Sequence, residues 1–330
     1  MPGIQDFTYA NFGVEATRGT PVAPTRQFYG EGTGVLEPDF GIDMHEGEHS
    51  GRRVLIRRAT SKNEDVNLKL KTVSGIGFDD LVVAGSFLAG GTAFVGGAAD
   101  KTYAPIPVIS GAANNPKSYS IDVGDDVQNW RVQYAMARKF KLSAALGGLT
   151  QLEYDLFGQR AVKTAKASPA VNNAIKIPAE LWTIKFAASF AGLAGASVQL
   201  NFLQEWELEV GTGLIWDHSM DGNLYGAQHV ETDISATLTM KAESTALAVS
   251  EWYDKAQAVT MDWIRLKAQG PVLGGTFYSA QFDLPVMYEL PSIIESHKNG
   301  INLYKVVAHL ADDGTNGLAP TFVQSLAALP

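Results

Sequence analysis

The sequence of 330 residues contains no cysteine. Disulfide bonds, thiolate metal sites and cysteine nucleophiles are therefore excluded, and the chain suits assembly in a reducing cytoplasm. The sequence also lacks any apolar run of the roughly 18 residues that a membrane-spanning helix requires. The first residues, Met1–Phe12, do not show the basic and then apolar pattern of a signal peptide. We therefore expect neither export nor membrane anchoring.

Basic charge is scarce as well. Lys and Arg number 26 against 35 Asp and Glu, which gives a net charge of −9. This charge is uneven, with −2 for the residues up to Arg160 and −7 for the rest. A protein that grips duplex DNA concentrates Lys and Arg on one face, so we do not expect tight binding to DNA.

Alternating apolar and polar residues, rather than long amphipathic helices, characterise the chain. The clearest strand is Val66–Lys71, which alternates strictly, as a strand with one buried face does. Only Phe78–Ala89 and Leu247–Ala258 have helical spacing. Turn residues separate the other expected strands, which are Ser118–Val123, Trp130–Tyr134, Leu149–Phe157, Leu181–Phe186, Trp206–Val210, Ile234–Met240, Thr276–Asp283 and Leu303–Leu310. The expected fold class is mainly β with two short helices.

The order of these elements occurs twice along the chain. Asp65–Lys71 aligns with Asp233–Thr239, and a segment of helical spacing follows each. A turn-rich hairpin arm precedes each aligned strand, at His45–Arg58 and at His218–His229. A second hairpin follows each helix, within Ser118–Gly158 and Thr276–Leu310. The Pro and Asn residues near position 170 favour a boundary between the copies. We expect domains at 1–160 and 181–330, joined by a linker at 161–180.

The amino-terminal segment Gly13–Arg26, G-V-E-A-T-R-G-T-P-V-A-P-T-R, resembles the opening of the major tail tube proteins of long-tailed (siphophage-type) bacteriophages. Many of these begin with a similar E-x-T-x-G-T-x-V-A-P-T signature. Gly147–Gln159 resembles the closing strand of the first half of that family's fold.

The resemblance implies tail-tube-type β-sandwich or barrel domains, each with a short flanking α-helix and a long hairpin arm. It also implies sheets that join into a closed inner barrel, and rings that stack into the conduit for DNA ejection. The expected location is the phage tail of the virion, after assembly in the host cytoplasm. The implied partners are further copies of the chain, the tape measure protein and other tail proteins, and DNA passes through without specific binding.

The duplication bears on the number of chains in a ring. The resemblance implies six single-domain subunits per ring. If each half supplies one such domain, a homotrimer provides six domains with pseudo-sixfold symmetry, and a homohexamer is the alternative.

One metal-binding pattern occurs literally, since His45, Glu46 and His49 satisfy the H-E-x-x-H motif. That zinc chemistry needs both histidines on one face of a helix, whereas Gly47 in the middle favours a loop. We interpret the match as fortuitous, within the tip of a polar hairpin. We expect no metal, no cofactor and no catalytic residue.

An acidic stripe is the candidate for the surface that faces the lumen. Glu205, Glu207 and Glu209 alternate along one expected strand, so their side chains share a face. Lys69 and Lys71 on the first alternating strand complicate a purely acidic lumen, and a solvated outer face is the competing interpretation of that strand.

A basic run is the candidate for the assembly arm. Arg52, Arg53, Arg57 and Arg58 flank the apolar residues Val54-Leu55-Ile56. Contact with DNA is conceivable for such a run, but it would impede transit. We favour an intersubunit role, because a basic arm that meets an acidic neighbouring ring gains complementary charge.

Two other functional classes are alternatives. Scattered aromatic and carboxylate residues also suit an all-β carbohydrate-binding or hydrolytic virion module. Another tail structural protein, such as a terminator, is the second alternative.

Overall fold

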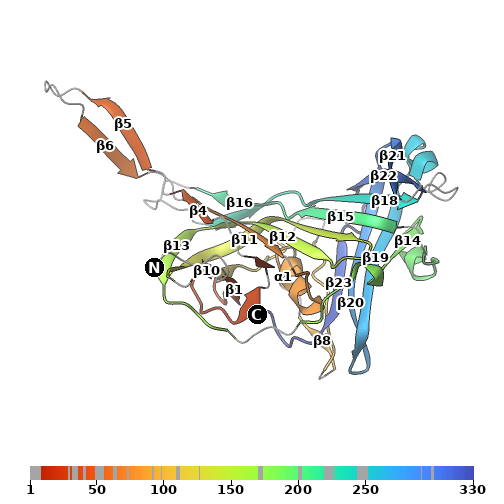
Figure 1. The fold of residues 1–330 in the computed structure, drawn as a ribbon, viewed down its shortest axis with the longest axis horizontal. Coiled ribbons are helices and arrows are strands. Elements are labelled where there is room, and N and C mark those ends of the chain that lie inside the picture. Colours follow the sequence, from red (N-terminus) through yellow and green to blue (C-terminus); the bar gives the residue numbers. More distant parts are fainter. Residues whose placement is uncertain are drawn as a thin grey trace.

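The structure is a computed structural model that describes residues 9–28, 30–31, 36–39, 42–48, 56–61, 65–72, 74–90, 93–97, 99–108, 112–125, 127–169, 174–199, 203–218, 226, 228–243, 252–290, 292–298 and 301–330. Within these residues the chain is mainly β, as expected. One antiparallel network of 19 strands contains most of it, and two further two-stranded sheets are separate (Figure 1).

The first half of the chain contributes eleven strands of the network. They are β1 (Tyr9–Val14), β2 (Arg26–Phe28), β3 (Gly30–Glu31), β4 (Leu36–Asp39), β7 (Asp65–Thr72), β8 (Val95–Gly96), β9 (Lys101–Tyr103), β10 (Tyr119–Gly124), β11 (Asn129–Ala145), β12 (Gln151–Gly158) and β13 (Arg160–Thr164). Neighbouring strands pair in the order β4–β7–β12–β11–β10–β1–β2. β13 adds to the amino-terminal part of β11, and β3 pairs with β7 beyond β4.

The second half contributes the other eight strands. They are β14 (Trp182–Ala187), β15 (Leu203–Gly211), β18 (Ser235–Glu243), β19 (Asp262–Leu273), β20 (Thr276–Tyr288), β21 (Ser292–Lys298), β22 (Ile301–Leu310) and β23 (Ala319–Gln324). Here the pairing order is β15–β18–β22–β20–β19–β14. β23 adds to β20, and β21 pairs with the amino-terminal part of β22.

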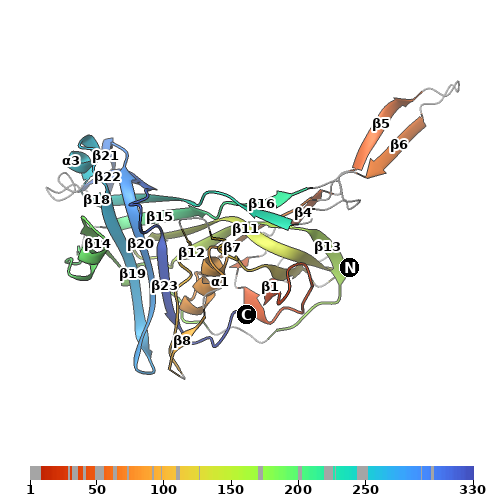
Figure 2. The same ribbon diagram turned by 180° about the vertical axis from the view of Figure 1, so that it is seen from behind.

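Two hairpins form the separate sheets. β5 (Ile42–Glu48) pairs with β6 (Ile56–Ser61), and β16 (Leu214–Asp217) pairs with β17 (Gln228–Glu231). Both hairpins occur where the sequence predicted arms, and His45 is the cross-strand partner of Arg58. The β5–β6 hairpin projects away from the body of the molecule (Figure 1, Figure 2).

The helices are short. The 3₁₀ turn η2 (Phe78–Asp80) leads into α1 (Leu81–Ser86), which confirms most of the first predicted helix. Every residue of α1 is buried, since the segment is apolar on all sides and packs beneath the sheets. The second predicted helix is observed as α3 (Asp254–Gln257), and residues 247–251 lie outside the described part. Two further 3₁₀ turns in the described residues are η3 (Ala179–Leu181) and η4 (Ala191–Ala194).

The two halves meet edge to edge in one continuous sheet. The carboxyl-terminal part of β11 pairs with β15, from Lys139 opposite Gly211 to Ala145 opposite Glu205. We call this pairing the seam. A single apolar core runs through both halves, with Phe12, Phe87, Tyr119 and Tyr154 among its aromatic residues in the first half and Trp182, Trp206 and Phe282 in the second. The predicted linker contacts the first half through bridges of Gly77 with Lys176 and of Leu149 with Pro178.

Candidate assembly and lumen surfaces

One face of the continuous sheet is polar over six strands. Burial alternates along β15, where Trp206, Leu208 and Val210 are buried and the glutamates between them are accessible. β18 alternates in the same way, and cross-strand pairing carries the pattern through β7, β12, β11 and β22. The apolar face packs on the core, so the polar face points away from the bulk of the chain.

Charges on this polar face are balanced. Among the described side chains at paired positions, six are basic, namely Lys69, Lys71, Lys139, Lys141, Lys241 and Lys305. Six are acidic, namely Glu153, Asp155, Glu205, Glu207, Glu209 and Glu243. Arg138, at a bulge of β11, adds a cation, and Glu289 adds a carboxylate beside His309. The face is thus close to neutral although the chain is acidic.

Ion pairs connect adjacent strands of the face. On the first half, Glu153 of β12 lies 2.5 Å from Lys71 of β7 and 3.9 Å from Lys141 of β11. Across the seam, Lys141 lies 3.1 Å from Glu207, and Lys139 lies 3.3 Å from Glu209. On the second half, Lys241 of β18 lies 3.1 Å from Glu205. Charges of opposite sign therefore alternate around the sheet.

Lys141 occupies the centre of this pattern. Partial burial lowers its pKa, but the hydrogen bond to Glu207 and the charges of Glu207, Glu153 and Glu209 outweigh burial, so that the pKa is raised overall. The ammonium is therefore held charged by carboxylates on both neighbouring strands.

The predicted acidic stripe is present, but it does not form an acidic surface, because lysines lie beside it. Glu205, Glu207 and Glu209 share the accessible face of β15, as predicted. Each lies within 3.3 Å of a lysine on a flanking strand. Sequence reasoning missed Lys139, Lys141 and Lys241 as their partners. All three lie outside the strands that the sequence predicted, and no local pattern reveals the strand register that brings them to the glutamates.

The described residues of the basic arm lie in its second strand. Arg57 and Arg58 belong to β6, whereas Arg52 and Arg53 lie outside the described residues. His45 and Glu46 lie in β5, which is a strand and not the helix that an H-E-x-x-H zinc site requires. His49 lies outside the described residues. Within the described part of the chain, no three His, Asp or Glu side chains are grouped so that they could hold a metal ion.

The signature segment that carries the family resemblance surrounds a buried carboxylate. Glu15 is 3% exposed. Its carboxylate accepts hydrogen bonds from the hydroxyls of Ser118 and Ser120 and from the backbone N–H groups of Gly19 and Tyr134, at 2.8 to 2.9 Å. Gly19 has φ of 74°, where glycine is favoured, and Tyr134 is held at φ of 52°. Glu15 thus ties the signature to β10 and β11.

Comparison with models of known protein families gave no match, and comparison with curated protein sequences gave none either. No helix in the described ranges is long and apolar enough to span a lipid bilayer.

Proposed function

We propose that this chain is a major tail tube subunit of a long-tailed bacteriophage, which polymerises into stacked rings that conduct DNA. The observation that carries the proposal is that the strands of the two halves pair in the same order. β4, β7, β12, β11, β10 and β1 correspond in order to β15, β18, β22, β20, β19 and β14. The arms β5–β6 and β16–β17, the helices α1 and α3, and the added strands β13 and β23 occupy equivalent places.

A pair of buried ion pairs supports the duplication. Arg131 of β11 holds Asp122 of β10 through two hydrogen bonds of 2.6 and 2.9 Å. Arg265 of β19 holds Asp283 of β20 with the same two distances. Each pair lies at directly opposite positions of the equivalent strands, with the acid and the base exchanged.

The seam within one chain provides a template for the contact between neighbouring chains. It joins the carboxyl-terminal part of β11 to β15. In the second half, the counterpart of the carboxyl-terminal part of β11 is β21, which follows β20. In the first half, the counterpart of β15 is β4. Among the described residues β21 pairs only with β22 and β4 only with β7, so each presents an open edge. Pairing β21 of one chain with β4 of the next would repeat the seam between chains. Closure of the sheet would then remove both aggregation-prone edges.

The ring that follows contains three chains and six equivalent units, with six chains as the alternative. Its polar sheet face would line the lumen, because the core, α1 and the outer strands occupy the other face. A lining on which cations and carboxylates alternate offers DNA no cluster of Lys and Arg to bind. This supports a lining past which DNA slides.

Electron microscopy of the purified protein, together with native mass spectrometry, tests the proposal. We expect rings or hollow filaments with three chains per ring. A protein that stays monomeric and particulate under assembly conditions would contradict the proposal and favour a binding module. Six chains per ring would still support a tail tube subunit but would contradict a ring of three two-domain chains. Because the chain has no cysteine, engineered cysteine pairs between 36–37 and 292–293 would test the edge contact by disulfide formation between chains.

A further inference from the structure

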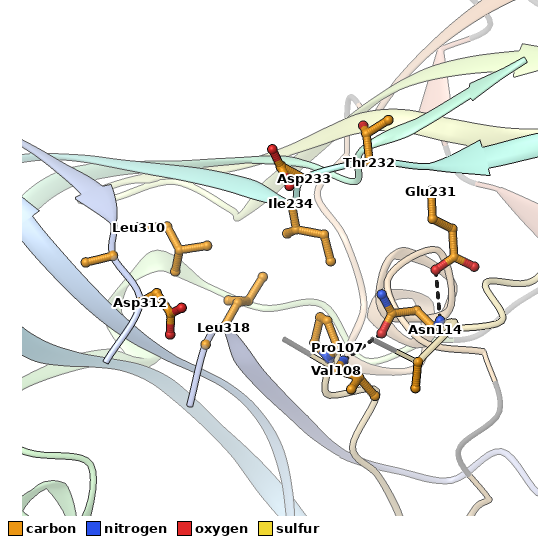
Figure 3. A pocket seen from close by; sticks show the side chains of 13 residues that line it. Pro107, Val108, Asn114, Glu231, Thr232, Asp233, Ile234, Leu310, Asp312 and Leu318 are labelled. Atoms are coloured by element: carbon orange, nitrogen blue, oxygen red, sulfur yellow. Dashed lines mark hydrogen bonds between the residues drawn. The ribbon is translucent and has the colours of Figure 1, made fainter. Parts of the chain in front are cut away.

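A groove opens where three segments of the chain meet (Figure 3). The segments are the loop that includes Pro107 and Asn114, the junction of β17 and β18, and the connection from β22 to β23. The groove has a volume of about 500 Å³. It lies on the body of the molecule, from which the β5–β6 hairpin leads away (Figure 1). The arm of a chain is therefore not placed to fill the groove of the same chain.

The lining combines apolar and acidic side chains. The larger apolar ones are Pro107, Val108, Ile234, Leu310 and Leu318, and the acidic ones are Glu231, Asp233 and Asp312. No basic residue lines the groove within the described part of the chain. Asp233 and Asp312 are solvent-exposed, so their charges are available to a ligand. A ligand that complements this lining would have apolar side chains flanked by cations.

One wall of the groove is fixed by hydrogen bonds. The Glu231 carboxylate accepts a hydrogen bond of 2.8 Å from the backbone N–H of Asn114, which ties the loop to β17. The Asn114 side-chain oxygen in turn accepts a hydrogen bond of 2.6 Å from the backbone N–H of Val108. A wall held in this way needs less ordering when a ligand binds.

The chain itself contains a segment of matching chemistry. Residues 52–58 read R-R-V-L-I-R-R, with a pair of arginines on each side of three apolar residues. In an extended backbone, alternate side chains share a side, so Arg52, Val54, Ile56 and Arg58 would face together. Two apolar side chains flanked by two guanidinium groups match an apolar floor with acidic edges.

We propose that the groove receives residues 52–58 of a second copy of the chain, as a contact between successive rings. This inference rests on the proposed tail tube function, since the second copy is supplied by ring stacking. It assigns a receiving surface to the arm. The groove also includes residues from both halves of the chain, so each subunit offers one such site.

A disulfide test uses two single-cysteine proteins. Val54→Cys places the thiol on the side of the arm that would face the groove, and Val108→Cys places it at a groove residue that is 48% exposed. Mixed and assembled under oxidation, they should give a covalent dimer. Val272→Cys, on the β19–β20 hairpin and 66% exposed, is the control partner and should give at least tenfold less dimer with Val54→Cys. Equal yields with both partners would overturn the proposal.

A binding test uses a labelled peptide of residues 51–60 and the full-length chain. Asp233→Asn with Asp312→Asn should weaken binding at least tenfold. Asn at 312 preserves the acceptor that receives the backbone N–H of Gly314. The control, Asp217→Asn with Asp254→Asn, removes two accessible carboxylates elsewhere and should change affinity less than twofold. An unchanged affinity in the groove variant, or no binding to the wild-type chain, would overturn the proposal.

The two tests separate this inference from the proposed function. Rings or tubes that form without the 54–108 disulfide and without peptide binding would refute the groove contact and leave the tail tube intact. Disulfide formation and peptide binding by a protein that never forms rings would support the groove contact between copies and refute the tail tube.

Discussion

Lys141 of β11 faces Glu207 of β15 across the seam, with 3.1 Å between the ammonium nitrogen and a carboxylate oxygen. The same ammonium is 3.9 Å from Glu153 on the other flanking strand. Both halves of the chain thus contribute to one ion-pair arrangement. The seam joins its strands through backbone hydrogen bonds and sets its register through alternating charges.

Removing the Lys141 charge should weaken the fold by about 1 kcal/mol or less, since the pair is partly exposed. The pKa of Lys141 is raised above its ordinary value of 10.5, so this stabilisation is present below pH 10.5 and is lost as the pH rises through the raised value. Urea unfolding of the wild type and Lys141→Met should therefore differ at pH 8, and the difference should shrink as the pH rises above 10.5. Lys101→Met, in β9, is the control. A difference that grows with pH would contradict the assignment.

The buried ion pair of Asp122 and Arg131 should matter far more. Asp122 is fully buried, and its loss leaves the guanidinium of Arg131 without its buried partner. Asp122→Ala should lower the free energy of unfolding by about 3–5 kcal/mol. Chemical denaturation measures this, with the exposed Glu205→Gln as a control that should change the free energy by less than about 1 kcal/mol.

Exchanging the pair tests the equivalence of the two halves. The second half places the base on β19 and the acid on β20, in the opposite sense to β10 and β11. The double variant Asp122→Arg with Arg131→Asp should therefore recover more than half of the stability that Asp122→Ala loses. A double variant as unstable as the single one would show that the two sites are not interchangeable.

The buried carboxylate of Glu15 gives a prediction for the signature segment. Each Glu15 oxygen accepts two hydrogen bonds, so Glu15→Gln keeps the shape but places a donor amide where one oxygen accepted from two donors. The variant should lose about 2–3 kcal/mol of unfolding free energy. Glu180→Gln, at an exposed carboxylate that accepts one backbone hydrogen bond, is the control. A loss at position 15 no larger than that of the control would contradict the role assigned to Glu15.

Alternation of apolar and polar residues made several strands predictable. Val66–Lys71 alternates, and β7 extends it by one residue at each end. β11 was expected only at Trp130–Tyr134, because Ala135, Met136 and Ala137 are all buried and break the alternation. Alternation does not reveal a strand segment that is buried on both faces. β19 was not predicted at all, although apolar and polar residues alternate along Ile264–Ala268 and burial alternates with them.

The candidate surfaces were predictable as lists of residues and not as contacts. The stripe of Glu205, Glu207 and Glu209 follows from spacing alone. Its pairing with lysines depends on a register set by the distant β11 and β18, which no local pattern encodes. For the same reason, the acidic composition suggested an acidic lumen, whereas the strand pairing gives a face close to neutral.

The charge balance of the polar face predicts how it responds to DNA. The wild-type chain should show negligible affinity for a duplex at physiological salt, because carboxylates balance the cations of the polar face in number. Changing Glu205, Glu207 and Glu209 to Gln leaves Lys139, Lys141 and Lys241 without the carboxylate partners they have on β15. These positions are partly exposed, so the fold should lose only about 1 kcal/mol or less for each pair. The face would then carry an excess of three positive charges.

Binding of the triple variant to a short duplex should appear at low salt and fall steeply as salt rises. If three phosphates are contacted, the logarithm of the association constant should fall with the logarithm of the salt concentration with a slope of about −2.7. Fluorescence anisotropy over a salt series measures this, and the triple change of Lys139, Lys141 and Lys241 to Gln is the control of opposite sign, which should not bind. Submicromolar binding by the wild type at physiological salt would refute a lining that lets DNA slide. If the variant with Glu205, Glu207 and Glu209 changed to Gln does not bind DNA at low salt, the polar face is not accessible to DNA in the isolated chain.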